Sequence, residues 1–314
     1  MVTLEGDRLV FRFPDVHEDA RLTVTFQRTL RIPDDDRHYP LPPGLGAFPL
    51  RHIDDYRRRL PKVPKAWVER GGVLMPMHQA EAMWISFGSH YPMAVKVATG
   101  KVNAITGSPL TRGLHRGPQD YLVTPGQPWL DGFCVEQGVI RQFVAMPLGQ
   151  GYSVEEQISR TAEQRERAGI ARRSAGGLDI ARRGADMGLA PGGRMRQEVY
   201  EDPFESADWA QRHMGRCFIT IVNTVLWPSL TGETPPSVSP TASDYTKAGL
   251  PWFEFYDPGA VALRGSDTLA RVRSVKAMSE STGVSVLPEN QSVDIQRTTR
   301  IHALRPRRVR EGRS

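Results

Sequence analysis

Residues 21–32 read RLTVTFQRTLRI, and their alternation decides the predicted fold class. Apolar side chains occupy every second position on one side, while Thr, Gln and Arg occupy most of the other; the apolar set is Leu22, Val24, Phe26, Leu30 and Ile32. A period of two residues is typical of a β-strand that buries one face. Arg28 breaks the apolar face, and the stretch otherwise predicts one long strand that lies on a core.

Residues 8–13, RLVFRF, repeat the alternation a short distance upstream, with Leu9, Phe11 and Phe13 on one side. Two neighbouring segments of this kind favour an antiparallel pair with one face on the core. The proline- and glycine-rich residues 33–49 are expected to form a loop without a regular element.

Residues 93–106, MAVKVATGKVNAIT, predict a hairpin that turns at Thr99-Gly100. Pairing outward from this turn brings Val97 opposite Val102. Alternation within the segment then separates its apolar and polar faces.

Residues 132–146, GFCVEQGVIRQFVAM, predict a second hairpin around Gln137-Gly138. The expected register sets Val135 opposite Ile140 and Cys134 opposite Arg141. With the first hairpin, it makes the N-terminal half rich in strands.

Helical signals begin at Ser153, which with Glu156 forms a capping-box pattern. After a Gly-, Ala- and Arg-rich stretch that we expect to be flexible, four regular segments are predicted: strands at 194–200, 216–223 and 292–304, and a helix from 266 through 281 that ends at Gly283.

The fold class predicted from these patterns is α+β, with a β-rich antiparallel sandwich or barrel-like core and a few peripheral helices. The chain is divided into a β-rich N-terminal half at 1–150 and a charged helix with a flexible segment at 151–193. A mixed α+β half at 194–304, packed on the first, and a basic tail at 305–314 complete it.

The net charge of +6 resides in two places. Residues 160–196 hold nine Arg against four acids, and residues 297–314 hold seven Arg against one acid, so the remaining residues are on balance acidic. Aromatic residues that could stack on bases are absent from both segments, so only non-specific binding to nucleic acid is expected. Arginine outnumbers lysine 35 to six, a skew that fits a GC-rich bacterial genome.

The start of the chain, MVTLEGDRLVF, lacks the basic end and apolar run of a secretory signal. The longest apolar stretch, at 217–230, is interrupted by Asn223 and Pro228 and is too short to span a bilayer. We therefore expect a soluble, cytoplasmic protein without membrane insertion. Two cysteines without a CxxC motif predict neither a disulfide framework nor a cysteine zinc site.

A cluster of Met75, Met77, His78 and Met83 raises the question of a soft-metal site. The alternative is that the methionines fill irregular gaps in a core. The second interpretation is preferred, so no metal and no cofactor are predicted. His78 is the polar member of the cluster whose partner the sequence does not name.

Cys134 is the candidate catalytic residue. If Arg141 lay beside it, the guanidinium would lower the pKa of the thiol and favour the thiolate, with His115 or His90 as base. The competing interpretation is a small buried cysteine in a strand. The sequence contains neither GxSxG nor SxxK, so hydrolases with those motifs are disfavoured.

Residues 188–197, GLAPGGRMRQ, are the candidate anion site. Gly192 and Gly193 free the backbone to direct N–H groups at a ligand, and Arg194 and Arg196 add positive side chains; Arg141 is assigned to the same ligand-binding set. The alternative is a glycine hinge. The segment matches neither GxxxxGK[ST] nor GxGxxG, so it predicts no known nucleotide loop.

The remaining candidate ligand-binding residues come from two aromatic runs that contain proline, QPWLDGF at 127–133 and GLPWFEFYD at 249–257. If Trp129, Trp252 and Tyr256 are exposed, they form a ligand or partner surface.

The leading hypothesis is a non-catalytic binding or assembly protein that presents aromatic and Arg-lined loops to a partner or an anionic ligand. A protein partner or self-assembly is expected. The alternative is an enzyme that acts on a phosphorylated or carboxylated small substrate with Cys134 as nucleophile. A third hypothesis is a nucleic-acid accessory protein.

Overall fold

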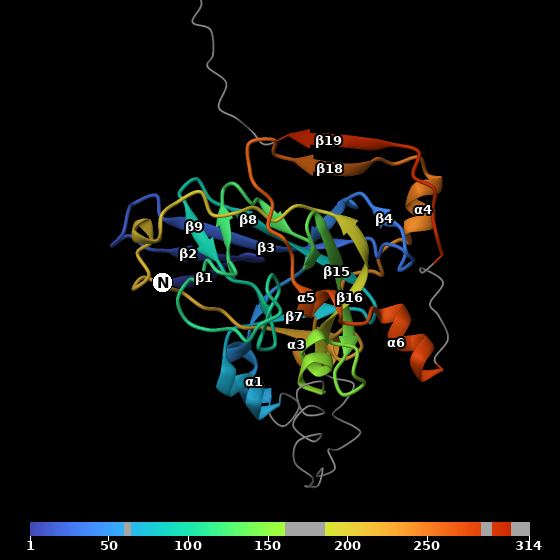
Figure 1. The fold of residues 1–314 in the computed structure, drawn as a ribbon. Helices are drawn as coiled ribbons and strands as arrows, with labels where there is room; N and C mark the ends of the chain where they lie inside the picture. Colours follow the sequence, from blue (N-terminus) through green and yellow to red (C-terminus); the bar gives the residue numbers. More distant parts are fainter. Residues whose placement is uncertain (60–63, 161–185, 284–290, 303–314) are drawn as a thin grey trace, which may run out of the picture.

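A large sheet forms the centre of the computed structural model, which describes residues 1–59, 64–160, 186–283 and 291–302. The strand order is β1-β2-β3-β8-β15-β16-β4, and β5, β13 and β14 pair with β3, β8 and β15 respectively (Figure 1). The strands are β1 (Val2–Glu5), β2 (Arg8–Arg12), β3 (Arg21–Thr29), β4 (His38–Tyr39), β5 (Gly44–Ala47), β8 (Ala82–Gly88), β13 (Trp129–Leu130), β14 (Gly132–Glu136), β15 (Val139–Pro147) and β16 (Met187–Arg196).

Smaller sheets surround it: β17-β7-β6, β12-β9, β10-β11 and β18-β19. Their strands are β6 (Arg51–His52), β7 (Val73–Met77), β9 (Met93–Val95), β10 (Ala98–Thr99), β11 (Val102–Asn103), β12 (Leu122–Thr124), β17 (Ile219–Asn223), β18 (Trp252–Tyr256) and β19 (Thr298–His302). The helices are α1 (Lys65–Arg70), α3 (Trp227–Thr231), α4 (Ala242–Lys247), α5 (Asp267–Ala270), α6 (Val275–Thr282), a helical stretch at 154–160, and 3-10 helices at Ile53–Arg59 and Ser206–Asp208.

The antiparallel pair expected from residues 8–13 and 21–32 is confirmed as β2 and β3, with Leu9 opposite Val24. Leu22, Val24 and Phe26 are buried, whereas the threonines between them are partly exposed. On the far side, β3 pairs along its length with β8. The alternating pattern therefore places one continuous apolar face over three adjacent strands.

Residues 33–49 are less irregular than their prolines and glycines suggest. The expectation of a loop without regular elements is wrong, since β4 pairs in parallel with β16 and β5 pairs with β3. Pro43 stays outside the ladder and accepts a hydrogen bond from the Thr29 hydroxyl at 2.7 Å.

The first predicted hairpin forms with a corrected register. Thr99 pairs with Val102, so the turn is Gly100-Lys101, and β9 pairs with β12 instead of with the strand after the turn. Gly100 has a φ of 59°, which suits glycine at this turn position.

The second hairpin turns at Gln137-Gly138 as predicted, with Glu136 opposite Val139. A bulge then shifts the register, so that Cys134 lies opposite Ile140 and Phe133 opposite Arg141. The predicted neighbours Cys134 and Arg141 are therefore wrong by one residue. Bulges of this kind leave no clear trace in a short alternating pattern.

A second bulge explains the paired glycines of β16. Arg141 pairs with Arg194 and Phe143 with Pro191, which leaves Gln142 opposite Gly192-Gly193. The Gln142 side chain instead accepts a hydrogen bond from Ile32 N at 3.0 Å and donates one to Leu30 O at 2.7 Å. The strand begins at Met187. The expected flexible segment up to residue 193 and the expected strand start at residue 194 are therefore wrong.

In the second half, the capping box is confirmed, because the Glu156 carboxylate accepts hydrogen bonds from the Ser153 N–H and hydroxyl. The single helix expected at 266–281 is two helices, α5 and α6. Ser266 and Ser274 each cap one of them, and Gly283 ends α6 in the left-handed conformation, as predicted.

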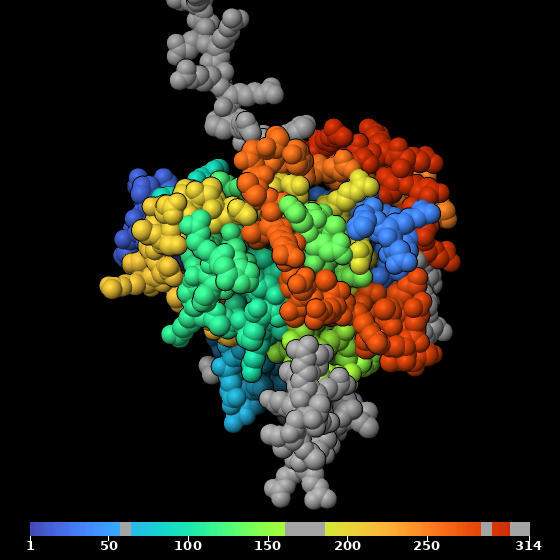
Figure 2. Space-filling model, viewed as in Figure 1, coloured from blue at the N-terminus to red at the C-terminus, as the bar shows by residue number. Residues whose placement is uncertain are grey.

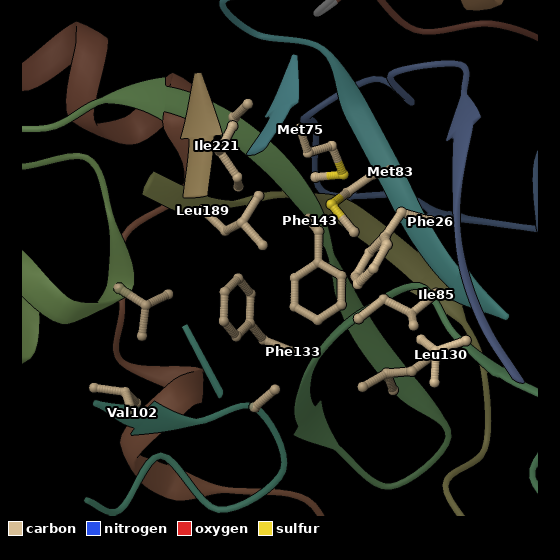
Figure 3. Close-up of a cluster of buried hydrophobic side chains, with 14 of the residues drawn as sticks. Phe26, Met75, Met83, Ile85, Val102, Leu130, Phe133, Phe143, Leu189 and Ile221 are labelled. Carbon is tan, nitrogen blue, oxygen red and sulfur yellow. The ribbon is translucent and has the colours of Figure 1, made fainter. Parts of the chain in front are cut away.

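The methionines of residues 71–87 belong to the core. Met75, Met77 and Met83 are at most 1% exposed, and Met75 and Met83 lie together beside Phe143 (Figure 3). The core position agrees with the interpretation of methionines as gap fillers.

The described residues confirm a β-rich α+β protein with a few helices. None of the sheets formed by these residues closes on itself, so the predicted sandwich or barrel is not confirmed. In this part of the chain, no helix is long and apolar enough to cross a membrane. The Arg-rich stretch 161–185 and the basic tail 305–314 lie outside the described residues.

Candidate ligand-binding cavity

A cavity of about 990 Å³ lies between the central sheet and the segments that cover it. Its floor is the buried face predicted from the alternating residues: Leu9, Leu22, Val24, Phe26, Ile85 and Phe87, from β2, β3 and β8. Its volume is at the upper end of the range of small-molecule pockets, which have mostly apolar walls.

Loops and short strands cover this floor, and no second broad sheet lies over it among the described residues. The covering segments are β9, residues 110–114 and residues 208–218, and all of them line the cavity. Figure 1 shows β9 and the yellow segment that precedes β17 beside the strands β1, β2 and β3. Gly215 lies so close to Phe11 that an added Cβ would be 2.9 Å from its ring.

Asp202 anchors the start of the covering segment 208–218. Its carboxylate accepts hydrogen bonds from the Tyr121 hydroxyl and from the Trp209 indole N–H, the latter at 2.8 Å. The backbone N–H of Asp202 in turn donates a hydrogen bond to the side-chain oxygen of Gln119 at 2.8 Å. Further on, the Gln211 amide oxygen accepts a bond from Leu114 N at 3.2 Å and joins two covering segments.

Three polar residues in the lining have an oxygen without a partner. They are Thr99, Asp186 and Thr220, whose atoms Thr99 Oγ1, Asp186 Oδ1 and Thr220 Oγ1 are buried without a hydrogen-bond partner among the described residues. The two threonines are 8% and 6% exposed. Most buried polar groups in proteins are hydrogen-bonded, so three unpaired oxygens among the lining residues are unusual.

Backbone pairing places two of these residues, Asp186 and Thr220, on one face. Asp186 lies opposite Val222 in an antiparallel bridge, so continuing that register sets Gly188 opposite Thr220, on the same face as Asp186. An added Cβ at Gly188 would lie 3.0 Å from Ser153, which precedes the helical stretch 154–160.

The same helical stretch also contacts the turn that follows Thr99. The carboxylate of Glu155 accepts a hydrogen bond from Lys101 N at 3.2 Å and lies against Gly100, next to Thr99. The Trp67 indole hydrogen-bonds to Asp186, and Arg70 lies close enough to stabilise its negative charge. Burial raises the pKa of the Asp186 carboxyl despite these two favourable contacts.

The rim carries charged and apolar side chains that are exposed to solvent. Met214 and Phe218 are 57% and 42% exposed although they line the cavity. Arg70, Arg112 and Arg216 are exposed cavity residues. The space-filling view shows the yellow covering segment, which includes Met214 and Arg216, at the surface (Figure 2).

The predicted nucleophile lies away from this cavity, in the core. Cys134 is 2% exposed, and burial raises the pKa of its thiol to about 12. Arg141 is not its strand partner; it donates to Gly192 O at 3.0 Å and lies 3.6 Å from Asp34. The expected lowering of the thiol pKa by Arg141 is therefore wrong, because desolvation of the thiolate dominates.

Neither His115 nor His90, the two histidines expected to act as the base, is paired with Cys134. His115 hydrogen-bonds through Nδ1 to Asp120 at 2.9 Å, and Lys96 binds the same carboxylate at 2.6 Å. His90 is exposed in the loop that follows β8. The structure does not assemble the cysteine–histidine pair that the sequence suggested.

The predicted anion-binding residues are adjacent but largely paired within the protein. Gly192 and Gly193 lie inside β16, and an added Cβ at Gly192 would be 2.6 Å from Val144. Arg194 binds Glu136 at 3.1 Å and Arg196 binds Glu254 at 3.2 Å. The glycines serve close packing, and an anion site at this position stays a prediction.

The aromatic candidates divide between core and surface. Trp252 is fully buried, Trp129 is partly buried beside Phe255 at a ring separation of 4.8 Å, and Tyr256 is 55% exposed. Trp129 and Tyr256 come from neighbouring elements, but Trp252 belongs to a separate core cluster with Tyr39 and Tyr245.

His78 has protein partners on both ring nitrogens. Nδ1 lies 2.8 Å from the Thr224 hydroxyl and Nε2 lies 2.9 Å from Pro236 O, to which it donates. The adjacent Glu81 accepts from His78 N at 2.9 Å and from Arg28 at 3.1 Å. This partly buried network attaches the proline-rich connection after α3 to the central sheet.

Sequence reasoning identified the apolar floor but missed Thr99, Asp186 and Thr220. A single threonine in a strand carries no signal that its hydroxyl lacks a partner. Comparison of the chain with protein-family models, with curated proteins and with solved structures found no match.

Proposed function

We propose that the protein is a non-catalytic binding protein that encloses the apolar body of a small amphipathic molecule. The observation that carries the proposal is the cavity of about 990 Å³ over the apolar face of β2, β3 and β8. Apolar surface removed from water contributes roughly 25 cal/mol per Å² to binding, so a long hydrocarbon chain would gain most of its affinity there.

This proposal keeps the class of binding protein expected from the sequence and changes the ligand site. Arg194 and Arg196 already have carboxylate partners, whereas the cavity offers both apolar area and unpaired polar atoms. Cys134 and Cys217 are both free thiols, which supports a reducing cytoplasmic location within the same proposal.

The enzyme alternative loses its main support. Its nucleophile would be Cys134, which is buried in the core with a raised pKa. Thiolate formation would require the side chain to leave its place among the core residues. A protein partner or self-assembly stays a prediction, and light scattering after size-exclusion chromatography measures it directly.

Fluorescence of the neutral dye Nile red tests the proposal. Val24 faces the cavity, and Val24→Trp would place an indole in the space of the ligand. We expect wild-type protein to bind the dye with saturation and the variant to bind it at least tenfold more weakly, while far-UV circular dichroism stays unchanged.

The matched control is Thr25→Trp, one residue along β3 on the opposite face. It should bind the dye like the wild type. Absence of saturable binding in the wild type, or equal loss in both folded variants, would refute the proposal. Solvent extraction of the purified protein followed by mass spectrometry then identifies a co-purifying amphiphile.

A further inference from the structure

We propose that the outward side of residues 213–218, at the mouth of the cavity, binds the surface of a membrane that contains anionic lipids, so that the ligand passes directly between the bilayer and the cavity. This inference rests on the proposed function, because it names the partner from which the same cavity receives its amphipathic ligand. The outward side consists of Met214, Arg216 and Phe218, which we call the mouth strip.

The backbone of this segment determines which side chains point outward. Residues 213–218 contain no helix or turn and lead directly into β17. Neighbouring side chains of an extended chain point to opposite sides. Gly215 faces inward, because an added Cβ would lie 2.9 Å from the ring of Phe11, and Cys217 packs against the main core cluster. The three residues of the mouth strip alternate with these two and therefore point away from the core.

The exposure of the side chains agrees with this arrangement. Met214 and Phe218 are 57% and 42% exposed, Arg216 is exposed, and all three line the cavity. Single exposed apolar residues are common on protein surfaces. Here two of them flank an arginine on one side of one segment, at the opening of an apolar cavity, which is the setting of an interaction surface.

The charges around the strip favour an anionic partner. Residues 209–232 contain neither Asp nor Glu, and Arg212 and Arg216 are both exposed. Arg112 adds an exposed cation on the neighbouring covering segment, which a hydrogen bond attaches to this one. Among the described residues, neither Arg112 nor Arg216 forms an ion pair with an acid. Their guanidinium groups are therefore available to the phosphates of anionic lipids.

Another cation lies near the end of the strip that joins β17. Val73 N donates a hydrogen bond to Phe218 O at 2.9 Å, and the backbone of Gly72 lies against that of Phe218. Arg70, which ends α1 two residues before Gly72, is exposed and lines the cavity. The exposed ring of Phe218 thus has a basic residue on a second element close to it.

A membrane surface fits the strip better than a folded protein does. A stable protein interface buries about 800 Å² on each side and involves roughly 20 to 30 residues of each partner. Two apolar side chains and a few arginines fall far short of that size. A bilayer requires no matching shape, because apolar side chains enter its headgroup region while cations bind the lipid phosphates.

The place of the strip gives membrane binding a purpose. A molecule with a large apolar body resides in membranes and not in water. Contact between the mouth of the cavity and the bilayer would let this molecule enter without exposing its apolar body to solvent. The reducing cytoplasmic location that belongs to the same proposal would place the protein at a leaflet that carries anionic lipids.

Co-sedimentation with lipid vesicles tests the inference. We expect the wild type to bind vesicles of phosphatidylcholine and phosphatidylglycerol in equal amounts at least about tenfold more tightly than vesicles of phosphatidylcholine alone. Raising NaCl from about 0.1 M to about 1 M shortens the Debye length from about 10 Å to about 3 Å and should remove most of this preference.

Arg216→Gln removes one cation from the strip and should weaken binding to the anionic vesicles about fivefold, which corresponds to about 1 kcal/mol. Its matched control is Arg271→Gln, which changes the net charge equally at an exposed arginine that does not line the cavity. The control should bind the vesicles as the wild type does. Far-UV circular dichroism should be unchanged in both variants.

Met214→Ser tests the apolar part of the strip. It should weaken binding to the anionic vesicles to a similar extent, because no apolar side chain would enter the headgroup region at this position. Val225→Ser replaces a valine that is 83% exposed and does not line the cavity, so it should have no effect.

Transfer of Nile red from vesicles to the wild-type protein tests direct passage of the ligand. If the ligand passes during contact, the transfer rate should rise in proportion to the vesicle concentration and should be higher from anionic vesicles. A rate independent of vesicle concentration would show that the dye crosses water first, and it would overturn the inference.

Three other results would overturn the inference and leave the proposed function intact. The first is saturable binding of Nile red by a wild type that binds anionic vesicles no better than neutral ones. The second is vesicle binding that survives in Arg216→Gln and Met214→Ser and disappears when the basic residues 305–314 are removed. The third is a dimer in light scattering that Met214→Ser abolishes, without vesicle binding, since the strip would then bind a second copy. A failure of Nile red to bind the wild type would instead refute the proposed function itself.

Discussion

Asp131 is a buried acid whose replacement should change how stability depends on pH. It lies between β13 and β14, is 3% exposed, and exchanges two hydrogen bonds with Gln197. Burial raises the pKa of its carboxyl from 3.8 to about 7, although the bond from Gln197 Nε2 at 2.6 Å favours the ionised form. Desolvation of the carboxylate is the larger of the two effects.

The sign of the pH dependence follows from the raised pKa. Between pH 3.8 and about 7, the folded protein retains a proton on Asp131 that the unfolded chain has lost. The free energy of unfolding should therefore fall as pH rises through this window and level off above it. A difference of about three pKa units at 1.36 kcal/mol each gives a loss of about 4 kcal/mol.

Asp131→Asn removes the titration and keeps a neutral side chain of the same shape. Near pH 4, where the wild-type carboxyl is protonated in the folded state, the two proteins should be similar in stability. At pH 8 the variant should be more stable by about 4 kcal/mol. Urea unfolding from pH 4 to 8, followed by circular dichroism, measures the difference by linear extrapolation.

The control is Asp15→Asn, since Asp15 is exposed in the turn after β2. The free energy of unfolding of this variant should differ from that of the wild type by the same amount at every pH. If the free energy of unfolding of Asp131→Asn changed with pH in parallel with that of the wild type from pH 4 to 8, the reasoning would be refuted. The carboxylate would then be stabilised in the fold by contacts stronger than its desolvation cost.

Three further predictions concern the core, the thiols and the cavity. Glu81→Gln should lower the unfolding free energy by about 3 kcal/mol in urea titrations, because it leaves the largely buried Arg28 without its carboxylate; a loss no larger than that of the exposed variant Glu5→Gln would contradict this. In a Cys217→Ser background, Cys134 should react with a thiol reagent at pH 8 only after unfolding, since its pKa is about 12; rapid labelling of the native protein would restore the nucleophile hypothesis. Along a series of straight-chain alcohols, Kd should fall about fourfold per methylene, equivalent to about 0.8 kcal/mol each; an affinity independent of chain length would rule out burial of the chain.

Alternation was sufficient to predict the strands that carry the cavity floor. Leu22, Val24 and Phe26 share one face in the sequence and in the structure, because the side-chain period of a strand is a local property. A different argument, that methionines fill irregular gaps in a core, placed Met75 and Met83 there. These predictions needed no knowledge of which strands pair.

Register was predicted less well, for a physical reason that Cys134 illustrates. The turn at Gln137-Gly138 was correct, but the bulge beyond it moved Cys134 from Arg141 to Ile140. A bulge is determined by how the strand packs between its neighbours, so an isolated hairpin does not reveal it. The nucleophile hypothesis depended on that one-residue assignment.

The unpaired polar residues of the cavity lining could not be predicted, because their surroundings are set by tertiary contacts. The bridge between Asp186 and Val222 places Thr220 on the same face as Asp186, and Thr99 lies beside Gly100, against which Glu155 packs. In the sequence each is an ordinary polar residue in a strand or beside one. Whether such a residue is satisfied depends on atoms that lie far away along the chain.

The cavity itself follows from how the apolar face of β2, β3 and β8 is covered. A second sheet would place side chains at regular intervals and fill the space between the layers at native density. Here the cover consists of the short strand β9 and of residues 110–114 and 208–218, which are held by individual bonds such as that between Gln211 and Leu114. Irregular segments cannot interdigitate with a pleated face along its whole length, so space remains between them. The alternating pattern that predicts the floor and the irregular segments that cover it are therefore the two conditions that together produce the cavity.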